Sequence, residues 1–328
     1  MGILKNFIKF YKPYKLLFFT DMFCALVVSV VDLSFPLVLS YLSAGFFARD
    51  RQIIIRSIIY MGIALLLIYI IKYFCQYFIA TWGHIMGARM ENDMRRDLFN
   101  HLQILPFSYY DENNTGEMMS KLVSDLFDIS ELAHHGPENV FISALKIIGS
   151  FLILLSINVQ MTVILSVVTL IMVIYSTYQN KIMQKIFLDN RKKIANINST
   201  VQDSLSGIRV VKTFANEELE KKKFGKRNSE YLRSKVDTYE IMGRFIAGNT
   251  FFEGLLYVVV IVAGGLFVTQ GTLKISDLAV YALYINIFIN PIDILINFTE
   301  LFQKGFAGFR RFNGVIQTVP TIVDKKGA

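Results

Sequence analysis

The feature that most constrains the fold is a set of six apolar stretches, each long enough to cross a bilayer. The hydrocarbon core is about 30 Å thick and needs about 20 apolar helical residues. Hydrophobic residues make up 53% of the 328 residues, more than is usual in soluble domains. The six stretches are residues 16–46, 53–82, 140–158, 159–181, 245–270 and 275–302. We therefore predict an all-α membrane protein of six long helices, with a very tight turn at residues 158–160.

Positive charge is distributed unevenly around these stretches. Six crossings place both termini on one side, and that side with its two long connections carries 28 of the 34 Lys and Arg residues. The other side has Arg49, Arg51, Arg56 and Lys274. Because cytoplasmic loops are rich in Lys and Arg, we expect a multi-pass protein of the inner (plasma) membrane with both termini in the cytoplasm. The net charge of +8 then reflects this rule and attraction to anionic lipid, and nucleic acid is not an expected partner.

The first residues have a pattern of their own. Apolar side chains recur on one helical face, and lysines occupy another, which is typical of a helix lying in the membrane interface. The apolar face comprises Ile3, Leu4, Phe7, Ile8 and Tyr11. We predict an amphipathic interfacial helix over residues 1–13, with a frayed basic tail as the alternative.

Helical periodicity continues well beyond the apolar stretches. It runs over residues 53–105, 120–157, 160–214 and 220–270. At 1.5 Å per residue the first of these rods is about 80 Å long, far more than a bilayer needs. Short breaks at residues 106–116 and 214–216 turn the chain back, so each forms a tip far from lipid. Two tips on one side suggest a soluble partner that binds there.

The tips carry motifs that resemble the transmembrane domain of ABC exporters, the six-helix type of bacterial multidrug and lipid-flipping half-transporters. The first tip has Tyr109, Tyr110, Asp111, Gly116, Glu117, Lys121 and Asp125. The second has Asp203, Gly207, Arg209, Lys212, Phe214 and Glu217. Arg310-Arg311 and residues 320–322 resemble the exit toward the family's nucleotide-binding domain. The family more often has Arg in place of Lys121 and Glu in place of Asp203.

The resemblance implies that the tips are coupling helices, at residues 113–122 and 213–220, seated on nucleotide-binding domains that bind ATP and Mg²⁺. It also implies a dimer, with an identical or different subunit, in which the fourth and fifth helices are exchanged. Independently of the family, Gly116 can open a helix, with Thr115 as its cap and Glu117 in its first turn. The plain alternative is that both tips are ordinary turns between helices.

The sequence lacks the chemistry of a motor or a metal enzyme. It contains no phosphate-binding G-x-x-x-x-G-K-[ST] loop, so we expect no ATP hydrolysis and no cofactor in this chain, and no catalytic residue. Residues 14–318 form the predicted transmembrane domain, and residues 319–328 are interpreted as a linker cut short before a nucleotide-binding domain. His134-His135, His84 and His101 lack the spacing of a metal site, and none is expected.

Polar residues in the last apolar stretch share one helical face. They are Asn286, Asn290, Asp293, Asn297 and Glu300, at steps of three and four residues, and a charged side chain facing lipid costs at least ~2.5 kcal/mol. With Asn249, Glu253 and Asp32 we predict that they line a central cavity, whose excess of acid suggests cationic or zwitterionic amphipathic cargo. The alternative is that these groups pair with Lys72 and Lys146 or hold helices together.

Together these patterns predict the cargo-translocating membrane domain of an ATP-driven exporter that works by alternating access. A drug, a lipid or a peptide is equally compatible as cargo. A channel, or a receptor or scaffold that docks a soluble cytoplasmic partner, is the alternative. Long rods with paired tips favour the exporter.

Overall fold

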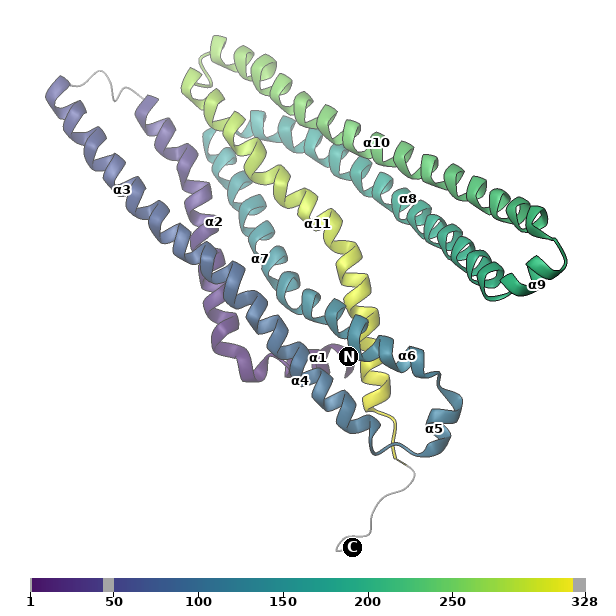
Figure 1. The fold of residues 1–328 in the computed structure, drawn as a ribbon. Coiled ribbons are helices and arrows are strands. Elements are labelled where there is room, and N and C mark those ends of the chain that lie inside the picture. Colours follow the sequence, from purple (N-terminus) through teal and green to yellow (C-terminus); the bar gives the residue numbers. More distant parts are fainter. Residues whose placement is uncertain (1, 44–49, 321–328) are drawn as a thin grey trace, which may run out of the picture. The chain divides into compact units, whose positions relative to one another are not determined.

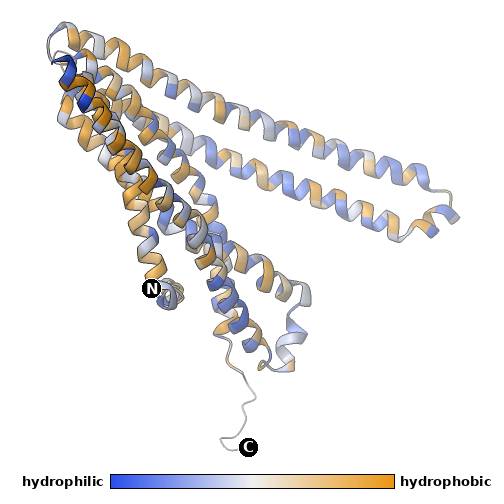
Figure 2. Cartoon of the chain, turned by 60° about the vertical axis from the view of Figure 1, so that its left-hand side comes forward, coloured by the Kyte–Doolittle hydropathy of each residue, from blue (hydrophilic) through white to orange (hydrophobic). Residues whose placement is uncertain are grey.

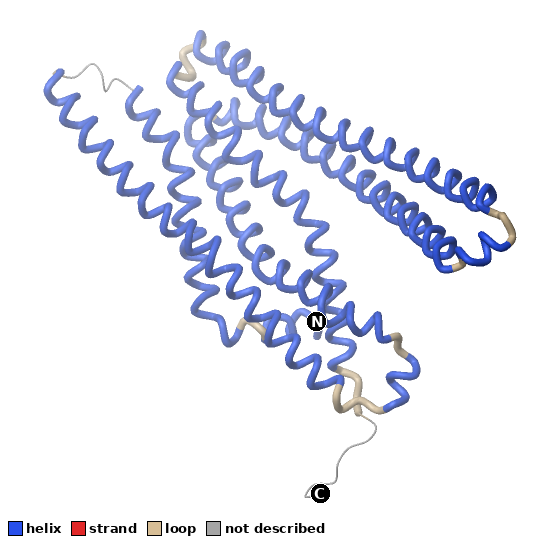
Figure 3. The backbone as a smooth tube through the Cα atoms, viewed as in Figure 1, coloured by secondary structure: helices blue, strands red, loops and turns tan. Residues whose placement is uncertain are grey.

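The computed structural model describes residues 2–43 and 50–320, with the side chains of residues 2–4 and 43 left undescribed. Six helices among these residues are long and apolar enough to cross a membrane, as predicted. The described residues contain helices and connecting turns and no strand (Figure 3). Met1, the end of the first predicted stretch (44–46), Arg49 and most of the predicted linker (321–328) lie outside the described residues.

The chain divides into two compact units, residues 1–159 with 265–328 (unit 1) and residues 160–264 (unit 2) (Figure 1). Unit 1 contains α1 (Gly2–Lys9), α2 (Lys15–Ser43), α3 (Arg51–Phe78), α4 (His84–Leu102), α5 (Phe107–Glu112), α6 (Thr115–Ser120), α7 (Leu126–Ile157) and α11 (Ile275–Ile316). Unit 2 contains α8 (Val159–Ser206, from its second residue), α9 (Ile208–Thr213) and α10 (Glu217–Thr269, up to Gly264).

In unit 1, α11 packs along α7, and α2 contacts α3, α7 and α11. The polar end of this bundle has a core of its own. Side chains from α4 and the turn after it, α6, α7 and α11 form it: Met94, Leu98, Leu102, Leu105, Met118, Leu126, Ile129, Phe309, Phe312 and Val315. Because this core is the kind that a water-soluble bundle needs, it can hold the helices together beyond the bilayer.

The predicted N-terminal helix is present as α1, and part of its apolar face contacts protein. The Phe7 ring lies 5.0 Å from that of Phe309, and the Tyr11 hydroxyl donates to the carbonyl of Ala133 at 2.6 Å. Ile8 remains 59% exposed. The helix is therefore anchored to the end of unit 1, and the side chains of Ile3 and Leu4 lie outside those described.

In unit 2, α8 and α10 form a long antiparallel pair joined through α9 (Figure 1). Polar groups join the two helices. Ser176 donates to Asn249 at 2.6 Å, and the Tyr175 hydroxyl donates to the carbonyl of Arg244 at 2.8 Å. Figure 2 shows hydrophobic residues at the end of the pair remote from α9 and hydrophilic residues toward α9, so the helices extend beyond their membrane-spanning part.

The turns have clear local causes. Asn158 alone separates α7 from α8 in extended conformation (φ −154°, ψ 117°), which confirms the tight turn predicted there. Gly271 has a φ of +75° between α10 and α11, a conformation that glycine adopts without steric cost. The Asp277 carboxylate accepts from the Lys274 N–H at 3.0 Å and caps the start of α11.

The predicted rods differ from the observed ones in detail. The rod expected over residues 53–105 ends at Leu102 and contains a π-helical segment, Ile79–Gly83. The rod expected over 120–157 begins at Thr115 and contains a second π-helical segment, Lys121–Asp125. The rod expected over 160–214 is interrupted at Gly207. A π-helical turn is a single-turn feature inside an α-helix, and the periodicity read over a whole rod did not indicate it.

Candidate functional site

The first tip consists of α5, an extended turn and α6. Asn114, whose side chain accepts from the Gly116 N–H at 2.8 Å, caps α6, so the predicted cap Thr115 is wrong and is instead the first helical residue. The predicted coupling helix 113–122 begins with the turn and runs into the π-helical segment. Asp111 and Glu117 are exposed, and their docking role stays a prediction.

The aromatic pair of this tip has a structural task. The rings of Tyr109 and Tyr110 meet edge to face, 5.6 Å apart. Tyr110 donates to the carbonyl of Leu102, and Tyr109 packs against the core of unit 1. Both tyrosines thus hold the tip onto the end of α4. Phe107, which is 85% exposed, is the most exposed aromatic residue of the tip.

Two charged residues of the first motif point inward. Lys121 is buried and pairs with Glu117 at 3.0 Å. Asp125 is 7% exposed and receives two hydrogen bonds from Arg311, Nε to Oδ2 and Nη2 to Oδ1, both of 2.7 Å. This bidentate pair is the strong form of a charged hydrogen bond. It joins the start of α7 to the end of α11, so Arg311 and Asp125 fix the base of the tip.

The second tip is α9 with the turns on either side. The predicted coupling helix 213–220 is wrong in position: the short helix is α9, and residues 214–216 form the turn into α10. Ala215 adopts a φ of +49° there, a left-handed conformation that composition gave no reason to expect. Phe214 is 69% exposed. Asp203 and Arg209 are also exposed.

Ionic contacts stabilise this second turn. Lys212 donates to Glu217 at 2.9 Å, and this hydrogen bond lowers the pKa of the Glu217 carboxyl. Ser204 donates to Glu220 across the ends of α8 and α10. A groove of about 630 Å³, lined mostly by polar and charged residues, lies beside Gly207. Its lining residues are Thr200, Asp203, Ser204, Gly207, Val210, Val211, Glu220, Lys223, Lys226 and Arg227.

The polar stripe of α11 is present as predicted on one face of a helix. Asn286, Asn290 and Asn297 are exposed in the described structure, whereas Asp293 and Glu300 are half-buried. Glu300 pairs with Lys304, one turn along the helix, at 2.6 Å. Asn249 and Glu253 belong to unit 2, one turn apart on α10, and the Asn249 side chain accepts the hydrogen bond from Ser176.

The structure agrees with the alternative interpretation of Asp32, in which its carboxylate pairs with Lys72 and Lys146. Its two carboxylate oxygens pair with Lys72 at 2.5 Å and Lys146 at 2.6 Å. Both ion pairs lie between helices, from α2 to α3 and from α2 to α7. One carboxylate therefore neutralises one of two ammonium groups and joins three helices, and the prediction that Asp32 adds negative charge to a cavity is wrong.

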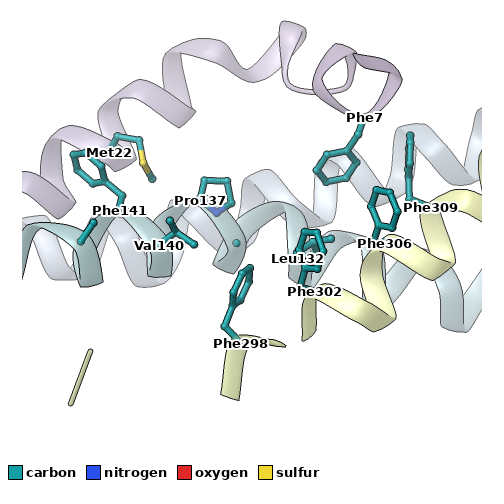
Figure 4. A pocket seen from close by; sticks show the side chains of 12 residues that line it. Phe7, Met22, Leu132, Pro137, Val140, Phe141, Phe298, Phe302, Phe306 and Phe309 are labelled. Atoms are coloured by element: carbon teal, nitrogen blue, oxygen red, sulfur yellow. The ribbon is translucent and has the colours of Figure 1, made fainter. Parts of the chain in front are cut away.

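An apolar pocket of about 560 Å³ lies between α1, α2, α7 and α11 (Figure 4). Aromatic side chains of α11 form one side of it, at steps of four and three residues: Phe298, Phe302, Phe306 and Phe309. Met22, Pro137, Val140 and Phe141 lie opposite, and Phe7 lies at one end. Sequence reasoning missed this pocket, although the four phenylalanines recur at helical spacing on a different face of the helix from the polar stripe.

Comparison with known proteins agrees with this architecture. Residues 18–292 match the family model of the ABC transporter transmembrane region. The uncharacterized ABC transporter ATP-binding protein YwjA of Bacillus subtilis is 36% identical over 98% of this chain and 56% of its own length. The putative multidrug export ATP-binding/permease protein YgaD of the same organism is 26% identical over 100% of this chain and 57% of its own length.

A third relative has a name that states its cargo. The ATP-dependent lipid A-core flippase of Syntrophus aciditrophicus is 23% identical over 100% of this chain and 54% of its own length. The chain thus spans about half the length of these curated relatives. Six apolar helices that continue into polar rods and short tip helices, together with a family match over most of the sequence, lead to one conclusion: this chain belongs to the ABC transporter transmembrane region family.

Proposed function

We propose that the chain is the cargo-translocating membrane domain of an ATP-driven ABC exporter. The observation that carries this proposal is the form of the two tips. In each unit, short helices end a pair of long helices at the polar side, with an exposed phenylalanine, Phe107 or Phe214, beside charged residues. Aromatic side chains often anchor protein interfaces, and one of the relatives is named as an ATP-binding/permease protein.

The work of the proposed machine is divided between domains. This chain supplies the membrane path, and nucleotide-binding domains, which bind ATP and Mg²⁺, dock at α5–α6 and α9. Both termini and both tips face the cytoplasm, because Lys and Arg are concentrated on that side. A second transmembrane subunit completes the path, and it covers the exposed polar stripe of α11. The bidentate pair of Asp125 and Arg311 lets the first tip move with α7 and α11 as one body.

The proposed cargo is amphipathic and leaves from the cytoplasm or the inner leaflet. The phenylalanine-lined pocket suits an apolar moiety, and the stripe of asparagines and acids on α11 suits a polar head. Asp32 and Glu300 are paired with lysines, so the proposed preference for cations is assigned to Glu253. Names of relatives include both multidrug export and lipid flipping, and both cargo classes share this chemistry.

The proposal is tested in proteoliposomes that contain the protein with its nucleotide-binding domains. Transport of a cationic amphipathic dye and dye-stimulated ATP hydrolysis are measured for Phe214→Ala. A matched control is Leu232→Ala on α10, because Leu232 is 63% exposed and lies outside the tip. We expect Phe214→Ala to reduce both activities about tenfold, since loss of a docking hot spot costs ≥ ~1.4 kcal/mol, and Leu232→Ala to leave them unchanged.

Two results would contradict the proposal. If ATP hydrolysis is unaffected by any cargo and no dye moves, the chain is a docking scaffold. If dye moves down its gradient without ATP, the chain is a channel.

A further inference from the structure

A cluster of ionisable side chains lies in unit 1, apart from the tips and the polar stripe. It consists of Asp21 on α2, His84 at the start of α4, and His134, His135 and Glu138 on α7. The three imidazole rings surround a common point. The His134 centroid lies 4.4 Å from those of His84 and His135, and the latter two are 5.1 Å apart.

The inner members of this cluster are buried without hydrogen bonds. Asp21 is 1% and His134 3% exposed, and the Glu138 side chain is 12% exposed. Within the part of the chain that the structure describes, both Asp21 oxygens, both His134 nitrogens and Glu138 Oε2 have no hydrogen-bond partner. An unpaired buried polar group costs about 1–3 kcal/mol, and a charged one more, so five such atoms in one place point to a bound water or ion.

The spacing of these atoms fits a metal ion better than a hydrogen bond. His134 and Glu138 are four residues apart on one face of α7, and His134 Nε2 lies 3.5 Å from Glu138 Oε2. Two ligand atoms that are each about 2.0–2.1 Å from a tetrahedral Zn²⁺ are about 3.3 Å apart. The donor atoms of Asp21, His134 and Glu138 all lie within 4.8 Å of one another, so small rotations of side chains would bring the third ligand into place.

Two sets of donors share His134. The second set, His84, His134 and His135, also falls within 4.8 Å. The set with the two carboxylates is favoured for two reasons. Its atoms are those that no described residue satisfies, and buried charged groups in proteins are paired or coordinate a metal ion. His84 is exposed, and its ring lies beside that of the buried His134.

We propose that Asp21, His134 and Glu138 bind a divalent transition-metal ion such as Zn²⁺, with the remaining coordination position held by water. One imidazole and two carboxylates form a donor set that Zn²⁺ accepts. The ion joins α2 to α7, two helices of the same bundle. Gly83 gives the His134 ring its room, because a Cβ at residue 83 would lie 2.2 Å from the ring.

The test is binding of Zn²⁺ and Co²⁺ to the purified, chelator-treated protein. Zinc content is measured by mass spectrometry, affinity by competition with a chromophoric chelator, and coordination by the visible absorption of Co²⁺. We expect one ion per chain and a loss of affinity of about tenfold or more in Asp21→Asn and His134→Gln. His101→Gln serves as the matched control, because His101 contacts the Thr318 carbonyl outside the cluster, and it should bind as the wild type does.

A second pair of variants changes no ligand residue. Gly83→Ala should displace the His134 ring and weaken binding, whereas Gly62→Ala, where a Cβ meets nothing within 4 Å, should not. Thermal unfolding without metal shows that each variant is folded. Absence of Zn²⁺ and Co²⁺ binding by the wild-type protein overturns the proposal. Loss of binding in His84→Gln and His135→Gln but not in Asp21→Asn overturns this ligand set.

Discussion

Asp32 should act as a counter-ion that holds three helices together, and the test is to remove its charge. Asp32→Asn keeps the shape of the side chain but leaves Lys72 and Lys146 facing each other without a carboxylate. The side chains of the two lysines are 25% and 20% exposed. An unpaired Lys at the centre of a membrane helix costs about 2.5–3.5 kcal/mol. Because each lysine is partly exposed, we take about half of that cost for each and expect Asp32→Asn to lower the free energy of unfolding by about 3 kcal/mol.

The charge count predicts an asymmetry between the three residues. Lys146→Met leaves one acid with one base, a neutral pair, and should cost less than about 1 kcal/mol. The triple variant with Asp32→Asn, Lys72→Met and Lys146→Met removes every charge and should recover most of the stability lost in Asp32→Asn, because apolar replacement of a buried ion pair is often neutral.

The assay is equilibrium unfolding in mixed detergent micelles followed by far-ultraviolet circular dichroism. A loss of 3 kcal/mol lowers the folding constant more than 100-fold. The reasoning is refuted if Asp32→Asn and Lys146→Met destabilise equally, or if the triple variant is as unstable as Asp32→Asn. Transport by the stable triple variant should persist, because the structure gives Asp32 a task in packing and not in cargo binding.

Three further outcomes are expected. Arg311→Met should lower the free energy of unfolding by about 2 kcal/mol, because it leaves Asp125 buried without its ion-pair partner, and the 46% exposure of Arg311 reduces the effect. Arg310→Met on the exposed side is the control, and equal unfolding midpoints of the two variants would contradict a stabilising ion pair. Gly305→Ala should lower the free energy of unfolding by about 1–3 kcal/mol, because the new Cβ would lie 2.7 Å from the Asp128 carbonyl oxygen. Gly265→Ala is the control, because a Cβ there meets nothing within 4 Å, and thermal unfolding should show a lower midpoint for Gly305→Ala only. Ala215→Gly should stabilise the turn after α9 by about 0.5 kcal/mol. The energy gained by removing a left-handed alanine is larger than the entropy cost of the more flexible unfolded chain. Slower amide exchange at Asn216 and Glu217 would show this stabilisation, and faster exchange would argue against strain at Ala215.

Local patterns in the sequence were sufficient for the architecture. The bilayer sets the length of each apolar stretch, and the periods of helices place the polar residues of α11 on one face, so six spans, the Asn158 turn and the stripe followed without coordinates. The two tips were also located, because loss of periodicity and Pro or Gly residues mark the ends of helices. Their helix boundaries were missed by several residues, since capping by Asn114 and the left-handed Ala215 depend on neighbouring turns.

Tertiary structure decided which distant side chains meet. Asp32 and Lys72 are 40 residues apart and Asp125 and Arg311 are 186 apart, and sequence spacing carries no information on such pairs. The same holds for Asp21 and Glu138, which stand on different helices and become neighbours only when α2 packs on α7. The order of residues in the sequence places acids and bases within the spans. Only the packing of the helices brings lysines to Asp32 and places Asp21 beside His134.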